Sequence, residues 1–409
     1  MNTQHPTRRT ATRLLTALSL TAAAVTSACD GSDPIGPTLA PEDRVSLGTV
    51  PIGLTAGDLA VPTAQPDAQM AAVLAQIAAV NPRMPHTLSP HELRNQPTFA
   101  DAVRATLAAQ GRPASAALEP VARVAHLRIP GPITSTDSLL VRVYTPAAGA
   151  AGTGPFPVIV YYHGGGWVIT DLDDYDASAR ALTNAAGAVV MSVAYRQAPT
   201  HKFPTAHEDA FAAYQWARTN AGLVGGNPAR VAVAGESAGG NLAAAVTLMA
   251  RDRNVPQPVH QLLVYPILDV NFETASYKEN ANAVPLSKPL MQWFFDKYLR
   301  SAGDANNPYV APLRTANVTG LPPATIINAQ IDPLRTEGEQ YAEKLRAGGV
   351  AVEQTTYAGV THEFFGMGAV VDKARLAVAQ AGAGLRRGFA AAPAASRAAD
   401  DNAVIVPLQ

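Results

Sequence analysis

The sequence predicts an α/β protein whose sheet is mostly parallel and is covered by helices on both faces. Short apolar runs recur from residue 156 onward, and stretches with helical spacing lie between most of them. Strands that alternate with helices are joined by crossovers, which make them parallel and bury both faces of the sheet. Two β-rich segments, near 122–128 and 138–144, have no helix between them and indicate an antiparallel edge.

Periodicity places the individual elements. Strands are expected at 122–128, 138–144, 156–162, 188–195, 230–235, 260–266, 324–330 and 351–357. Helices are expected at 67–80, 98–110, 173–186, 205–219, 238–251, 335–348 and 370–387, with a further short one that begins at Pro90 behind the N-cap Ser89. Between 269 and 322 the chain is too long for a simple crossover and contains a helical stretch at 285–299. Such an insertion at the carboxyl ends of the strands would lie over an active site.

Composition narrows the class of protein. The 409 residues are 47% hydrophobic and 15% charged, which is typical of a soluble globular protein with a substantial core. Lys and Arg (31) balance Asp and Glu (32) to a net charge of -1, and the body of the chain has no run of basic residues. This balance argues against a nucleic-acid binder and against electrostatic binding to a membrane.

The N-terminus has the layout of a secretory signal. Basic residues at 8, 9 and 13 precede an apolar stretch at 14–25, which is too short to span a membrane and is followed by small residues. We expect a signal peptide over 1–28 and an extracytoplasmic protein that is secreted, periplasmic or lipid-anchored to the bacterial cell envelope. The alternative is an amphipathic or disordered leader, and the Arg8-Arg9 pair lacks the apolar residues that a twin-arginine signal requires.

Cys29 is the single cysteine, so the chain can form no internal disulfide. Together with Thr26, Ser27 and Ala28 it resembles the lipobox of bacterial lipoproteins, although Thr26 stands where leucine is usual. That resemblance implies lipidation of Cys29 and membrane anchoring through it; an ordinary cleavage site beside an incidental cysteine is the alternative. The Pro- and Gly-rich residues 29–66 have linker composition, and the Ala-rich residues 391–409 are expected to form a flexible tail. The folded domain should therefore span 67–390.

A G-x-S-x-G sequence, Gly235-Glu236-Ser237-Ala238-Gly239, indicates a nucleophilic serine. It follows the apolar run 231–234 directly and leads into a strong helix former, which is the strand, sharp turn and helix of a nucleophile elbow. The turn requires small neighbours, which Gly235 and Gly239 supply, and the helix start directs amides toward a developing oxyanion. The alternative is an ordinary Gly/Ser turn.

A second motif, His163-Gly164-Gly165-Gly166-Trp167, follows the apolar run 158–162. Three glycines at a strand end let backbone amides face a substrate, as an oxyanion hole requires. A phosphate loop would need G-x-G-x-x-G or the P-loop Lys-Ser/Thr, neither of which is present here. A plain flexible turn remains possible, and His163 itself is expected to orient the loop.

The base and the acid follow from chain order. A serine at such an elbow is followed by an acid and then by a histidine. Of the two downstream histidines, His362 lies in a loop straight after the last strand, whereas His260 begins a strand at the edge remote from the elbow. Asp332 follows the penultimate strand and is favoured as the acid over Asp269, at the end of the preceding strand, and over the acidic residues 296 and 304 of the insertion.

Together these motifs resemble the bacterial branch of the hormone-sensitive-lipase-like esterases over about residues 67–390. His163–Trp167 is similar to the family's oxyanion motif, 235–240 to its serine motif, 195–204 to a further signature, 332–334 to its acid segment and 359–364 to its histidine segment. Glu236 stands where aspartate is commoner. The resemblance implies an α/β-hydrolase fold with an eight-stranded mixed sheet and a helical cap formed by 67–115 and 270–320.

The same resemblance implies a serine carboxylesterase acting on short- to medium-chain esters. Ser237 would attack the ester, His362 would carry the proton, and Asp332 would orient His362. Oxyanion donors would be the amide of Ala238 and two amides among Gly164, Gly165 and Gly166. No cofactor or metal is expected, and the partner would be a small-molecule ester. An amidase or lactonase on the same triad, or a non-catalytic ligand-binding homologue, are the alternatives.

Overall fold

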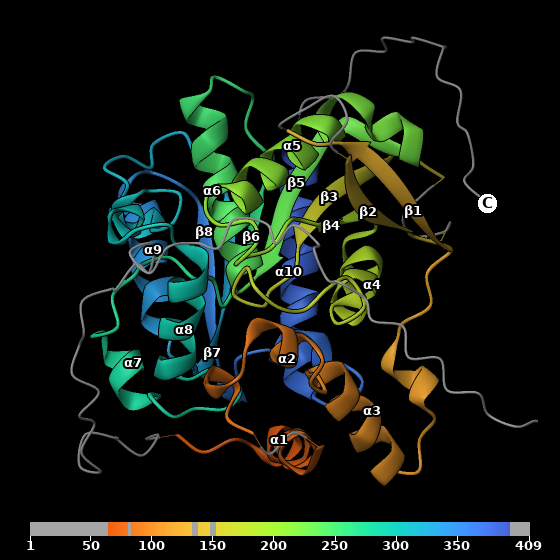
Figure 1. Cartoon of the computed structure of the whole chain (residues 1–409). Coiled ribbons are helices and arrows are strands. Elements are labelled where there is room, and N and C mark those ends of the chain that lie inside the picture. Colours follow the sequence, from red (N-terminus) through yellow and green to blue (C-terminus); the bar gives the residue numbers. More distant parts are fainter. Residues whose placement is uncertain (1–63, 81–82, 133–137, 148–152, 393–409) are drawn as a thin grey trace, which may run out of the picture. The chain divides into compact units, whose positions relative to one another are not determined.

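The computed structural model describes residues 64–80, 83–132, 138–147 and 153–392 (Figure 1). These residues all belong to one compact unit of the chain. The predicted signal peptide, Cys29, nearly all of the predicted linker and residues 393–409 of the predicted tail lie outside the described residues. Among the described residues, no helix is both long and apolar enough to cross a membrane.

Eight strands form one sheet, which confirms the predicted fold class. The strands are β1 (Arg123–Pro130), β2 (Ser138–Thr145), β3 (Phe156–Tyr162), β4 (Val189–Ala194), β5 (Gly226–Glu236), β6 (Gln261–Val264), β7 (Ala324–Ile331) and β8 (Val352–Thr361). Their order is β1-β2-β4-β3-β5-β6-β7-β8. Strands β3 to β8 run parallel, whereas β1 and β2 pair antiparallel with their neighbours, as the absence of a helix between them predicts.

Ten α-helices accompany the sheet in the described part of the chain. They are α1 (Ala68–Val80), α2 (Pro90–Arg94), α3 (Phe99–Ala109), α4 (Asp176–Ala186), α5 (Thr205–Asn220), α6 (Ala238–Asp252), α7 (Ala275–Glu279), α8 (Lys288–Tyr298), α9 (Arg335–Ala347) and α10 (Asp372–Ala391). Helix α10 runs four residues beyond its predicted end. The short 3-10 helices are η2 (Pro85–Thr87), η3 (Ala114–Ala117), η4 (Ala221–Val224), η5 (Ala302–Asn306), η6 (Pro312–Arg314) and η7 (Phe364–Met367).

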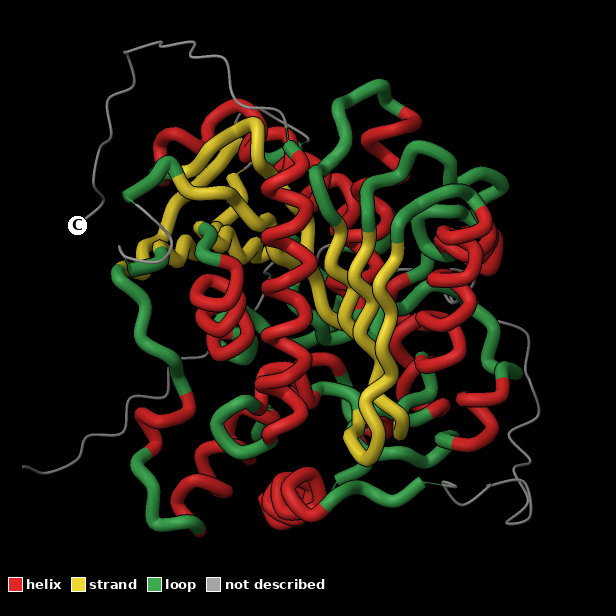
Figure 2. The backbone as a smooth tube through the Cα atoms, turned by 180° about the vertical axis from the view of Figure 1, so that it is seen from behind, coloured by secondary structure: helices red, strands yellow, loops and turns green. Residues whose placement is uncertain are grey.

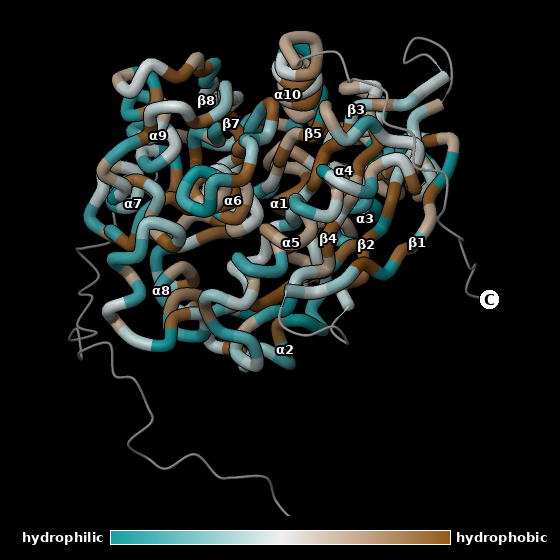
Figure 3. Tube along the Cα trace, turned by 90° about the horizontal axis from the view of Figure 1, so that it is seen from above, coloured by the Kyte–Doolittle hydropathy of each residue, from teal (hydrophilic) through white to brown (hydrophobic). Residues whose placement is uncertain are grey.

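The alternation of side chains along the central strand β3 divides the core into two layers. Val158, Val160 and Tyr162 pack toward α5, α6 and α9, whereas Ile159 and Tyr161 pack toward α4 and α10. Figure 2 shows α10 crossing the second face, and Figure 3 shows hydrophobic residues concentrated along the inner strands. Because both faces are covered, β3 is apolar at every position, as a buried parallel strand should be.

Helices α1 and α3 pack against each other beyond one end of the sheet, and α2 lies at the same end but apart from them (Figures 1 and 3). The guanidinium of Arg94, in the last turn of α2, donates to the carbonyl oxygens of Val168 and Ala198, both at 2.7 Å. Those carbonyls belong to the loops that leave β3 and β4, so α2 is tied to the carboxyl ends of the parallel strands. Ser89 forms the predicted N-cap, and Glu92 completes a capping box with it.

Candidate active site

Ser237 lies in the sharp turn between β5 and α6, with backbone angles of φ 56° and ψ −118°. This conformation is sterically unfavourable for a residue with a side chain, and it persists only because the surrounding backbone enforces it. A Cβ at Gly235 would lie 2.1 Å from the carbonyl oxygen of Gly239, and a Cβ at Gly239 would lie 1.9 Å from that of Tyr162. The two glycines of the motif therefore let β5, β3 and α6 approach closely enough to form the turn.

His362 joins the candidate nucleophile to the candidate acid. Its Nε2 lies 3.0 Å from Oγ of Ser237, and its Nδ1 lies 2.7 Å from Oδ2 of Asp332. The second carboxylate oxygen of Asp332 accepts the amide of Leu334 at 2.8 Å. All three side chains of this set are buried. The Asp332 charge favours the tautomer protonated at Nδ1, which leaves Nε2 free to accept the serine proton.

The pKa of His362 is raised above its ordinary value. Burial opposes the charged ring, but the charge and hydrogen bond of Asp332 favour it, and the carboxylates of Glu363 and Glu236 add to this effect. These carboxylates therefore stabilise a positive charge on the His362 ring.

The residues considered as rivals lie elsewhere. His260 is buried at the start of β6, where its Nε2 is 2.9 Å from Oγ1 of Thr325. Asp269 accepts from Arg314 at 2.6 Å instead of from a histidine. The two acidic residues of the insertion bind neighbouring cations, Asp296 with Lys297 and Asp304 with Arg300. The structure therefore brings together with Ser237 only the pair that chain order favours.

The glycine-rich loop after β3 has unoccupied amides. Among the described residues, the backbone N–H groups of Gly164, Gly165 and Gly166 donate no hydrogen bond. The amide of Ala238, at the first position of α6, has no partner within its own helix. Gly165 and Gly166 have φ values of 91° and 58°, which side chains rarely adopt. These four amides are the donors that the sequence predicts for an oxyanion hole.

His163 holds the glycine loop in place through contacts with Tyr195 and Gly164. Its ring stacks on Tyr195 with centroids 4.4 Å apart, and its Nδ1 lies 2.9 Å from the carbonyl oxygen of Gly164. The Tyr195 hydroxyl donates to the carbonyl of His163 at 2.9 Å. Burial lowers the pKa of His163 to about 4, so the ring is neutral at physiological pH. These contacts fit the orienting role that the sequence suggests for this residue.

A buried acidic network beside the candidate triad is not predicted by the motifs. Glu236 accepts hydrogen bonds from the hydroxyls of Tyr161, at 2.5 Å, and Tyr265. Oε1 of Glu363 accepts from the hydroxyl of Tyr175 at 2.7 Å and lies 3.9 Å from Nε2 of His362. Burial, with the charge of Glu363, raises the pKa of Glu236 to about 7. The sequence offered one clue to this network, because Glu236 directly precedes Ser237 and Glu363 directly follows His362.

Within the described ranges, no group of three or more histidine, cysteine or acidic side chains is arranged to hold a metal ion. The arrangement itself is suited to acyl transfer, because a serine, a base and an acid are in hydrogen-bonding contact and the glycine loop after β3 packs against the serine turn.

Comparisons with known proteins agree with this geometry. A family profile described as the alpha/beta hydrolase fold matches residues 159–366. The carboxylic ester hydrolase LipN of Mycobacterium tuberculosis is 43% identical over 250 residues, which cover 60% of this chain and 65% of LipN, just under two thirds of its length. The carboxylesterase NlhH of the same organism is 40% identical over 250 residues, which cover 60% of this chain and 77% of NlhH.

Solved structures show the same likeness in three dimensions. An esterase of Pyrobaculum calidifontis superposes with a TM-score of 0.66 and 37% sequence identity, over 77% of this chain and 97% of the esterase. Since the family profile covers half of the sequence and the solved fold is the same, the chain belongs to the α/β-hydrolase family, in its hormone-sensitive-lipase-like branch of carboxylic ester hydrolases.

Proposed function

We propose that this chain is a serine carboxylesterase that cleaves acyl esters of short to medium chain length through Ser237, His362 and Asp332. The observation that carries the proposal is the continuous chain of hydrogen-bonding contacts from Ser237 Oγ through His362 to Asp332, at 3.0 and 2.7 Å. The turn that carries Ser237 packs against the glycine loop, whose amides at Gly164, Gly165 and Gly166 have no partner of their own among the described residues.

Each residue then has a defined step. His362 Nε2 takes the proton of Ser237 as Oγ attacks the ester carbonyl, and the amides of Ala238 and two of the three loop glycines stabilise the oxyanion. The protonated Nε2 gives its proton to the leaving alkoxide, which yields the alcohol and an acyl-enzyme. Water, deprotonated by the same nitrogen, then hydrolyses the acyl-enzyme and releases the acid. Asp332 orients the ring throughout.

The restriction to shorter acyl chains is supported by the space at the glycine loop. A Cβ at Gly166 would lie 2.2 Å from the ring of Phe294, which belongs to α8. This helix comes from the 270–320 insertion, so we propose that the insertion and the N-terminal helices form the cap over the substrate. An aromatic ring so close to the loop leaves little room for a long chain.

Active-site labelling and substrate profiling test the proposal together. A fluorophosphonate should label wild-type protein on Ser237, and Ser237→Ala should lose both the label and several orders of magnitude of esterase activity. p-Nitrophenyl esters of increasing acyl length should give the highest kcat/KM at short to medium length. Faster cleavage of matched anilides or lactones would favour the amidase or lactonase alternative. A folded protein that neither labels nor cleaves any short ester would exclude the enzyme.

We also propose that the protein acts outside the cytoplasm and is anchored through a lipidated Cys29. The support is the residue pattern at 8–29, with basic residues, an apolar stretch and small residues before the cysteine. Expressed at full length in a bacterium with a lipoprotein pathway, the protein should partition into membrane fractions, and Cys29→Ala should release it. An unmodified mature N-terminus found by mass spectrometry would contradict the anchor.

A further inference from the structure

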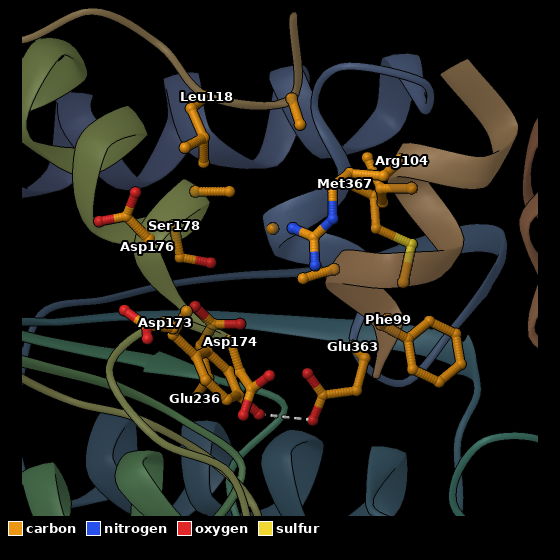
Figure 4. A pocket seen from close by; sticks show the side chains of 16 residues that line it. Phe99, Arg104, Leu118, Asp173, Asp174, Asp176, Ser178, Glu236, Glu363 and Met367 are labelled. Atoms are coloured by element: carbon orange, nitrogen blue, oxygen red, sulfur yellow. Dashed lines mark hydrogen bonds between the residues drawn. The ribbon is translucent and has the colours of Figure 1, made fainter. Parts of the chain in front are cut away.

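A cavity of about 220 Å³ lies beside the candidate triad (Figure 4). Glu236 and Glu363, the chain neighbours of Ser237 and His362, both line it. Oε1 of Glu363 is 3.9 Å from Nε2 of His362, so the cavity wall reaches the triad on the Nε2 side. The Tyr175 hydroxyl in the same wall would lie 2.2 Å from a Cβ at Gly164, so it also borders the glycine loop. A group bound in this cavity would therefore be close to the reacting atoms.

The lining carries an excess of negative charge. Two of its five acidic residues pair with arginines outside the cavity, Asp173 with Arg142 at 2.6 Å and Asp176 with Arg180 at 2.7 Å. Arg104 is the one basic side chain among the described residues that line the cavity, and it pairs with Asp101 at 2.7 Å. Arg104 is thus paired with a carboxylate that does not line the cavity.

The other three acidic residues, Asp174, Glu236 and Glu363, form no ion pair with a lysine or arginine of the described chain. Burial raises the pKa of Asp174 to about 6, with the charge of Asp171 adding to it, and burial raises the pKa of Glu363 as well. Buried and half-buried carboxylates behave in this way when no lysine or arginine compensates their charge. Apart from His362 when its ring is protonated, the described chain offers these three carboxylates no cation.

A buried hydroxyl also lines this cavity. Ser178, near the start of α4, is 1% exposed, and its side chain lies beside Glu236 and Tyr161 of the acidic network. Its side chain points toward the space between Asp176 and Glu363 in Figure 4. The oxygen of this hydroxyl can accept a hydrogen bond from a donor on a ligand bound in the cavity.

The chemistry of the lining favours an organic cation over a metal ion. No cluster of three or more ligating side chains in the described chain has a metal-binding arrangement, so the carboxylates are too dispersed for a metal. Phe99 and Tyr175 contribute aromatic surface to the walls. Dispersed carboxylates together with aromatic rings suit an ammonium group that carries alkyl substituents.

We propose that this cavity binds the protonated amine of an ester whose alcohol portion carries that amine, so that amino-alcohol esters are preferred substrates. This inference rests on the proposed esterase function. The alcohol portion is assigned because Nε2 of His362 must protonate the leaving alkoxide, and the cavity wall at Glu363 lies on the Nε2 side. The acyl portion would then lie toward Gly166 and Phe294.

Two esters of nearly the same shape test this assignment on the wild-type enzyme. 2-(Dimethylamino)ethyl acetate is protonated in neutral buffer, and 3-methylbutyl acetate replaces its nitrogen with carbon. With hydrolysis followed by pH-stat and corrected for the spontaneous rate, kcat/KM should favour the cationic ester by about tenfold or more, as a compensated buried charge predicts. Equal values, or a preference for the neutral ester, would overturn the assignment.

Matched variants locate the effect. Asp174→Asn should reduce the ratio of the two kcat/KM values severalfold, because it removes one uncompensated carboxylate from the cavity. Glu343→Gln removes an exposed carboxylate from α9, a helix that contributes no residue to the lining, and should leave the ratio unchanged. If Asp174→Asn did not fold, the wild-type ratio would still decide the question. A ratio that falls equally in both variants would show a long-range charge effect and contradict the site.

Failure of this inference can be told apart from failure of the proposed function. If neither acetate is hydrolysed and Ser237 takes no fluorophosphonate label, the esterase proposal itself is wrong. If both acetates are hydrolysed at comparable kcat/KM, the esterase stands and only the cation site is refuted.

Discussion

Replacing Asp332 with asparagine removes the charge that faces the imidazolium while keeping the size of the side chain. The acceptor oxygen of Asp332 lies 2.7 Å from Nδ1 of His362, and both groups are buried. With an effective dielectric constant of about 20, two unit charges at this distance attract each other by about 6 kcal/mol. Since 1.36 kcal/mol corresponds to a tenfold change in rate, we expect kcat to fall by about 10⁴-fold.

The assay is p-nitrophenyl butyrate hydrolysis by wild-type protein, Asp332→Asn and the control Asp269→Asn. Asp269 is the acidic residue that ends the preceding strand region and pairs with Arg314 at the partly exposed surface, so its loss should change kcat by less than about threefold. Circular dichroism must show both variants folded. If Asp332→Asn kept more than about a tenth of wild-type kcat, or if Asp269→Asn lost as much activity, Asp332 would not be the orienting acid.

Three further perturbations should have measurable effects on rate or stability. The neutral form of His362 is the base and its pKa is raised, so kcat/KM should fall as the pH drops through a value above about 6.5. A pH–rate profile with a lower midpoint would show that the neighbouring carboxylates do not raise the pKa of His362. Gly235→Ala would place a Cβ 2.1 Å from a backbone oxygen and should lower the free energy of unfolding by about 3 kcal/mol or more. As a control, Gly222→Ala adds a Cβ that meets nothing within 4 Å and should leave the midpoint of thermal unfolding unchanged. Tyr161→Phe removes a hydrogen bond to Glu236, whose pKa is about 7, so the loss of stability should be small near pH 5 and reach about 1.5–3 kcal/mol near pH 9, where the carboxylate is charged; equal thermal shifts at both pH values would refute this.

The regular elements could be read from local patterns with small errors. The run expected at 156–162 is β3, Phe156–Tyr162, and the helix expected at 205–219 is α5, Thr205–Asn220. The strand expected at 260–266 is shorter in the structure, because Tyr265, whose amide still donates to Ile327, has a φ of 34° and turns the chain away after that bond. Burial on both faces makes parallel strands continuously apolar, and this signal does not depend on distant contacts.

The sequence could predict which residues form the candidate site, but not the contacts that surround them. Chain order separates His362 from His260 and Asp332 from Asp269, because the elbow fixes which strand ends carry each group. The acidic network could not be derived in this way. Glu236 and Glu363 are 127 positions apart, and the tyrosines that hold them come from three different segments. Their pKa values depend on burial and on one another, which no local pattern encodes.

By itself, the sequence determined the fold class, the serine motif and the glycine loop, because periodicity and steric demands on backbone turns act over a few residues. Only the tertiary structure decided which oxygen faces each imidazole nitrogen, and that Ser178 and Glu363 face one cavity beside the triad. The physical reason is that hydrogen bonds and charge compensation depend on distances of a few ångströms between groups far apart in the chain. Those distances are set by packing. The sequence could therefore predict that Ser237 is a nucleophile, but it could not predict the carboxylates that surround it.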